Sequence, residues 1–195
     1  MSRIRRFSHA IAEGDGISVV AAVEDAQAAR AAEAQRAEAL VVVGDPALVR
    51  EATGLPILWR AESALERAVE VADAVNLAIG EDDDAAGRLQ RRHEEALALG
   101  LDCAVEVRNE EELEQALELV DPEIFLLAPP PGDSETRFEA MLDLLAAVPA
   151  GKLAVADLRV TTEYEVHELE RAGVDAVIVH AADVSPLVGD APPEV

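Results

Sequence analysis

One acidic side chain in an apolar run is the clearest candidate for chemistry in this chain. Glu106 lies within the otherwise apolar run 103–107, and a two-residue strand periodicity places it on the same face as Arg108. A carboxylate in such surroundings must be paired with a cation or accept hydrogen bonds. A carboxylate held in this way suits a general acid or base. An ion pair with Arg60 or Arg108, without any chemistry, explains the same pattern equally well.

Cationic side chains at the ends of three other apolar runs could bind an anion together. Arg60, Arg159 and His180 each stand at or just beyond the end of such a run. The guanidinium fork of arginine matches the geometry of a phosphate group. The alternative is that the three are separate, solvated side chains without a common ligand.

Trp59 and the remaining histidines offer weaker chemistry. Trp59 could stack on an aromatic ligand, or its ring could simply fill the core. His9, His93 and His167 have no metal-ligand spacing around them, so we expect no metal site. The acidic run 81–84 is typical of a solvated loop.

The composition excludes several classes of partner. The 195 residues include 40 acidic and 16 basic side chains, a formal net charge of −24. This charge argues against binding nucleic acid or an anionic membrane surface. A lone cysteine, Cys103, cannot form an internal disulfide, and no run is long enough to span a bilayer. No apolar signal core follows the basic residues 1–6, so we expect a cytoplasmic protein.

An alternation of apolar runs with amphipathic, charged segments indicates the elements that position these residues. Runs that are nearly continuously apolar are typical of strands buried on both faces of a parallel sheet. Eight such units, spaced by about twenty to thirty residues, predict a single compact (β/α)8 TIM barrel, whose site lies at the carboxyl ends of the strands. The predicted strands are 17–23, 39–43, 57–59, 74–79, 102–107, 123–127, 153–156 and 175–179.

Local signals place the ends of several helices and of the domain. Asp45 and Pro46 predict an N-cap and a first helical residue, and Thr162 with Glu165 predicts a capping box. Residues 1–13 are expected to form a short helix that covers the bottom of the barrel. Three prolines and a glycine in 183–195 predict a poorly formed last helix. We therefore expect a barrel domain over 1–185 and a loose tail over 186–195.

Several segments, in the right order, resemble one enzyme family. The segment 100–113, Gly-Leu-Asp-Cys-Ala-Val-Glu-Val-Arg-Asn-Glu-Glu-Glu-Leu, resembles the fifth-strand motif of the indole-3-glycerol-phosphate synthases. Weaker similarity to the same family is present in the segments 16–21, 55–60, 153–157 and 172–179. The resemblance implies a (β/α)8 fold and a cofactor-free lyase of tryptophan biosynthesis, a decarboxylase that closes an indole ring with release of CO2 and water.

The resemblance also implies roles for individual residues. Glu106 matches a catalytic glutamate, Arg60 stands in place of a catalytic lysine, and Asp157 stands in place of a glutamate. Arginine is always protonated, so Arg60 could hold a charge but could hardly donate a proton. Arg159 and His180 replace the glycines whose backbone N–H groups bind phosphate in the family, and bulky side chains block that close approach.

Other family positions differ more strongly, which shapes the functional hypothesis. The first-strand glutamate and lysine are replaced by Ala22 and Glu24, the sixth strand runs into Ala128 and three prolines, and the first βα loop is nearly absent. General acid–base groups are typically worth about 10²- to 10⁴-fold each, so these losses predict little or no synthase activity.

Two hypotheses remain for function. In the first, the chain is a divergent synthase-like barrel with Glu106, Arg60 and Asp157 as catalytic residues and with Arg159, His180, Arg108 and Trp59 binding substrate or phosphate. In the second, it is a non-catalytic pseudoenzyme that binds a small phosphorylated metabolite or a partner protein. The sequence makes no prediction of the oligomeric state.

Overall fold

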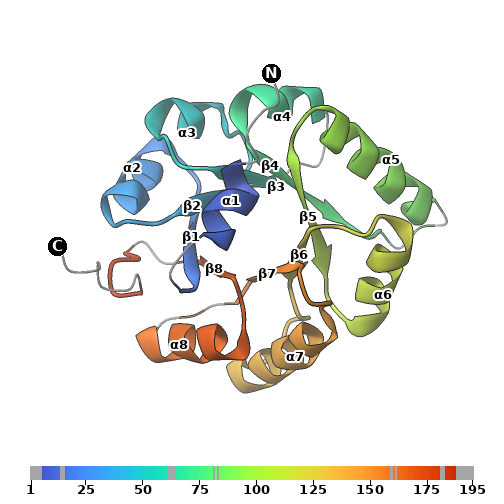
Figure 1. Cartoon of the computed structure of the whole chain (residues 1–195). Coiled ribbons are helices and arrows are strands. Elements are labelled where there is room, and N and C mark those ends of the chain that lie inside the picture. The colour runs from blue at the N-terminus through green and yellow to red at the C-terminus, as the bar shows by residue number, and fades with distance from the viewer. Residues whose placement is uncertain are drawn as a thin grey trace.

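The computed structural model describes residues 6–13, 16–60, 65–80, 82, 84–158, 160, 162–180 and 183–187, and within them eight strands close into a barrel (Figure 1). The strands are β1 (Ser18–Val23), β2 (Ala39–Val43), β3 (Ile57–Arg60), β4 (Ala74–Ala78), β5 (Asp102–Val107), β6 (Ile124–Leu127), β7 (Leu153–Ala156) and β8 (Ala176–Val179). Each strand pairs in parallel with the next, and β8 pairs with β1. The predicted TIM barrel is confirmed, with every strand inside its predicted run or one residue beyond it.

Helices alternate with these strands, and all but the first of them form a ring around the barrel (Figure 1). They are α1 (Arg6–Ala12), α2 (Ala26–Ala34), α3 (Ala47–Ala52), α4 (Leu65–Val71), α5 (Ala85–Ala98), α6 (Glu110–Leu119), α7 (Ser134–Ala147) and α8 (Glu163–Ala172). Among the described residues, none of the helices is long and apolar enough to cross a membrane.

Two separate apolar clusters hold the barrel together, because alternate strand residues face opposite sides of the sheet. One cluster fills the barrel interior and includes Val41, Leu58 and Leu126. The other lies between the sheet and the surrounding helices and includes Val42 and Trp59. A strand residue is therefore directed either into the barrel or toward the helices, and this alternation fixes which polar residues reach the site.

The amino-terminal helix α1 covers one end of the barrel, as predicted for 1–13, although residues 1–5 of that prediction lie outside the described residues. Phe7 and Ile11, both almost fully buried, belong to the interior cluster. The backbone N–H of Ser8 donates to Asp102 at the start of β5, at 2.9 Å. Burying side chains of this size stabilises a fold by about 1.5–3 kcal/mol each, so α1 closes the barrel floor as part of the core.

Acidic residues at the strand entrances fix the same end of the barrel. Asp175 accepts a hydrogen bond from the backbone N–H of Ala154 at 2.7 Å, and Glu38 accepts one from Val19 at 2.9 Å. Each carboxylate thus satisfies a backbone donor at the start of the preceding strand. The acids at this end are structural and lie opposite the candidate site.

Helix ends agree with the sequence signals in most places. Thr162 and Glu165 form the full capping box that begins α8, and Gly173 ends this helix in the left-handed conformation with φ 95°. The prediction for Asp45 and Pro46 is wrong by one residue: α3 begins at Ala47, whose backbone N–H donates to Asp45 at 3.1 Å.

The segment after β8 contains no helix within the described residues 180 and 183–187, in agreement with the predicted poorly formed last helix. The backbone N–H of Val184 donates to Gln35 of α2 at 2.8 Å, and Leu187 is buried against the outer cluster. The remainder of the predicted tail, 188–195, lies outside the described residues.

Candidate functional site at the carboxyl ends of the strands

An acidic and two basic side chains meet where β3, β7 and β8 end. Asp157 accepts a hydrogen bond from Arg60 Nη2 through one carboxylate oxygen, and its other oxygen lies 2.9 Å from His180 Nε2. The interior residues Leu58, Val155 and Ile178 each precede one of these side chains by two positions. Strand periodicity therefore directs all three polar side chains to the barrel opening.

The cationic partners control the ionisation of Asp157. Burial raises the pKa of this carboxyl, but the hydrogen bonds from His180 and Arg60 and the charge of Arg60 outweigh burial and lower the pKa to about 2. Only 15% of the Asp157 side chain and 22% of the Arg60 side chain are exposed. Near neutral pH Asp157 is therefore a mostly buried anion that neutralises the guanidinium beside it.

Helix α7 contributes a further cation that the sequence analysis missed. Arg137 Nη2 donates to the backbone carbonyl oxygen of Asp157 at 3.3 Å, and the Nε atoms of Arg137 and Arg60 are buried without a partner among the described residues. The available signal was the position of Arg137 in the first turn of the helix that follows β6, because that turn lies at the same end of the barrel.

The central carboxylate of β5 has a neutral partner. Asn76 Nδ2 donates to Glu106 at 2.8 Å, from the neighbouring strand β4. Among the described residues, Glu106 makes this one hydrogen bond and no ion pair. The alternative of an ion pair with Arg60 or Arg108 is therefore wrong. Asn76 was not among the predicted site residues, and its Oδ1 atom is buried without a partner in the same set.

Trp59 does not lie at the opening. Since Arg60 is directed into the barrel, alternation turns Trp59 toward the helices, where it is buried in the outer cluster. Its Nε1–H donates to the carbonyl oxygen of Gly44 at 2.6 Å. Of the two alternatives for this ring, the structure places it in the core.

Arg108 also lies apart from the Asp157 cluster. The Nη2 atom of Arg108 donates to the carbonyl oxygen of Ile79 at 3.3 Å. The backbone N–H of Arg108 donates to the carboxylate of Glu112, at the start of α6, at 2.8 Å. Arg108 follows Val107, the last residue of β5, and among the described residues no hydrogen bond or ion pair joins it to Glu106. Arg159 lies outside the described residues.

A cavity of about 440 Å³ opens between β1, β2 and α2 and reaches His180. Ala22, Val41 and Val43 form part of its wall, and Glu24 and Asp25 lie at its edge. The β1–α2 loop is only residues 24–25, and Asp25 caps α2 at once, so this loop is too short to cover the cavity. Among the residues that the structure places, no group of three or more His, Cys, Asp or Glu side chains could hold a metal ion.

Known proteins share this architecture and part of the sequence. Over 140 residues, which are 68% of this chain and 51% of the relative, the chain is 36% identical to the indole-3-glycerol phosphate synthase of Variovorax paradoxus (strain S110). It is 31% identical over 137 residues, 67% of this chain and 52% of the relative, to the synthase of Geobacillus sp. (strain WCH70). The chain spans about half the length of the curated relatives it matches.

A solved structure supports the same fold. The N-acetylmannosamine-6-phosphate 2-epimerase from Clostridium perfringens superposes with a TM-score of 0.70 at 16% identity, over 87% of this chain and 88% of that one. No family model matches the chain. The fold and the sequence matches together make this protein a TIM barrel that is a distant homologue of the indole-3-glycerol phosphate synthases.

Proposed function

We propose that this protein is a divergent, synthase-like barrel with little or no indole-3-glycerol phosphate synthase activity. The pairing of Arg60 with Asp157 carries this proposal. Arg60 stands where the family resemblance implies a catalytic lysine. The carboxylate of Asp157 forms an ion pair with Arg60 and neutralises the guanidinium charge. A guanidinium keeps its protons at any accessible pH, so it cannot serve as a general acid.

The arrangement around Glu106 supports the same proposal. Its carboxylate accepts a hydrogen bond from Asn76, an amide that donates but carries no labile proton. Proton transfer in a ring closure needs both an acid and a base at the reacting atoms. Glu106 alone could supply one of these groups, and its described hydrogen-bond partner, Asn76, does not supply the other.

The open cavity at His180 favours a second function, the binding of a small phosphorylated metabolite. His180 is 41% exposed, and the adjoining space of about 440 Å³ is within the size range of small-molecule sites. A phosphate group there could contact His180 and compete with Asp157 for Arg60. Because Asp157 is already ionised, we propose weak binding without turnover.

Turnover of the synthase substrate by the purified protein tests the first proposal. Formation of the indole product is followed by fluorescence, with Glu106→Gln as the matched variant. We expect no signal above the variant. A rate that is clearly higher for the wild-type protein, and that Glu106→Gln lowers by about 10²-fold or more, would show that the synthase reaction is retained.

Binding of glycerol 3-phosphate tests the second function. Its effect on the melting temperature is compared between wild-type protein and His180→Ala, with glycerol as the uncharged control. We expect a small rise in Tm that depends on the phosphate and on His180. Equal shifts for both ligands, or for both proteins, contradict phosphate binding at the barrel mouth and leave a partner protein as the alternative.

A further inference from the structure

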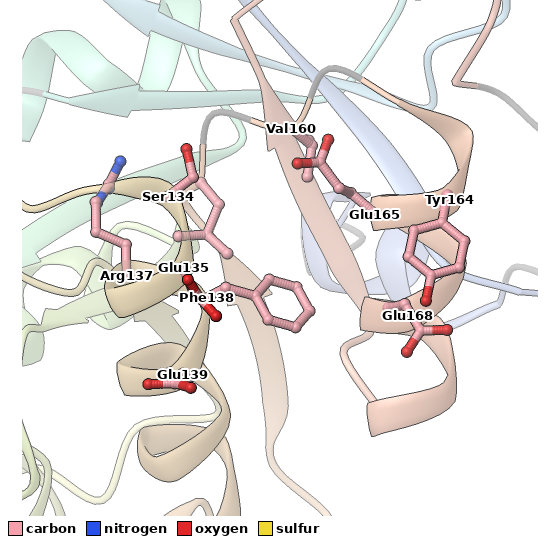
Figure 2. A pocket seen from close by; sticks show the side chains of 10 residues that line it. Ser134, Glu135, Arg137, Phe138, Glu139, Val160, Tyr164, Glu165 and Glu168 are labelled. Atoms are coloured by element: carbon pink, nitrogen blue, oxygen red, sulfur yellow. The ribbon is translucent and has the colours of Figure 1, made fainter.

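A second cavity lies outside the barrel, in the groove between α7 and α8 (Figure 2). Its volume is about 410 Å³, which is within the range of small-molecule sites. Leu158 and Val160, from the segment after β7, lie at its base and are each only 5% exposed. The groove therefore has an apolar floor that belongs to the core.

Aromatic side chains form two of its walls. Phe138 of α7 is directed toward α8, and Tyr164 stands on the first turn of α8 across the groove (Figure 2). Tyr164 is 71% exposed, which leaves most of a large aromatic ring in contact with water. Aromatic faces carry negative electrostatic potential and attract cations.

Carboxylates line the rim of the same cavity. Glu135 and Glu139 lie on α7, and Glu165 and Glu168 lie on α8. Glu165 is engaged in the capping box and Glu168 pairs with Arg171, but Glu135 and Glu139 make no ion pair with another described residue. Arg137, the cation among the lining residues, is directed away from the groove and donates to Asp157.

We propose that the groove between α7 and α8 binds a small organic cation, an ammonium or guanidinium group on an aliphatic or aromatic body. The apolar floor and the facing rings accept the body of the ligand. The charged group lies near the ring faces and the carboxylates of Glu135 and Glu139, where a cation is favoured electrostatically. An anion of the same shape is repelled by these carboxylates and by the net charge of −24.

Titration with phenethylamine, followed by amide chemical shifts in NMR, tests this site on the full chain. 3-Phenylpropanoate and 2-phenylethanol serve as the anionic and neutral probes of similar shape. We expect saturable shifts with the amine that concentrate on α7, α8 and residues 158–160, and weaker or no shifts with the other two probes. Equal responses to all three probes, or shifts spread over the acidic surface, would overturn the proposal.

Matched variants separate the groove from general charge. The pair Glu135→Gln and Glu139→Gln removes the two unpaired carboxylates, whereas Glu114→Gln and Glu118→Gln removes two exposed carboxylates at the same spacing on α6. We expect the first pair to weaken amine binding by about three- to tenfold and the second pair to leave it unchanged.

Tyr164→Ala tests the aromatic wall separately. Because Tyr164 is exposed, its removal leaves the fold intact, which circular dichroism checks. We expect a loss of affinity of about threefold or more for the amine. Unchanged amine affinity in both Tyr164→Ala and the α7 pair would refute a cation site in the groove.

Discussion

Asp157 is the residue on which the candidate site depends, and its ionisation predicts a pH effect on stability. The ordinary value of 3.8 applies to the unfolded chain and the folded pKa is about 2. The stabilisation is therefore fully present above about pH 4 and is lost as pH falls toward 2. Its size is roughly 2 kcal/mol, because each pKa unit corresponds to about 1.4 kcal/mol.

Urea unfolding of wild-type protein and Asp157→Asn measures this contribution. We expect the variant to be less stable at neutral pH and the difference between the two proteins to shrink as pH falls below 4, since asparagine cannot be protonated in this range. An exposed substitution, Glu118→Gln, controls for the loss of one acid. A difference that stays constant across the acid range would mean that the pair of Asp157 with Arg60 adds no stability.

Sequence reasoning at the residue scale identified which polar side chains stand at the carboxyl ends of the strands, but not the contacts they make. Arg60, Asp157 and His180 were expected at the carboxyl ends of their strands, and the structure brings the three together there, each two positions after an interior residue. Their mutual contacts were not predicted, since partner choice depends on the spacing of strands far apart in the chain.

At the scale of elements, the strands were predicted almost to the residue because a barrel strand is apolar on both faces. Helix starts depend on single hydrogen bonds, so the α3 start was misplaced by one residue while the α8 capping box was correct. Asn76 and Arg137 were missed because their roles come from neighbouring elements. The type of a polar residue in a strand or first helical turn does not show which group of a neighbouring element it will contact.

The closing helix α1 gives a prediction at the same scale. Phe7 is fully buried in the barrel interior, so Phe7→Ala should lower the free energy of unfolding by about 3–5 kcal/mol. Leu48→Ala on α3, where the side chain is 67% exposed, should change it by less than about 0.5 kcal/mol. Urea unfolding of both variants measures the effect, and a similarly small loss for Phe7→Ala would mean that α1 is not part of the core.

At the scale of the whole molecule, the net charge of −24 opposes the compact state that the core favours. Acidic side chains on neighbouring helices repel one another. At 0.1 M salt, this repulsion is largely screened between exposed charges that lie more than about 10 Å apart. Added sodium chloride should therefore raise the melting temperature, by roughly 2–4 °C for each kcal/mol of repulsion removed. The paired change Glu114→Gln and Glu118→Gln on α6 removes one repulsive contact at i,i+4 spacing, so it should raise Tm at low salt and reduce the response to salt. A Tm that falls with salt in the wild-type protein would show instead that favourable pairs such as Arg60 with Asp157 outweigh the repulsion between surface carboxylates.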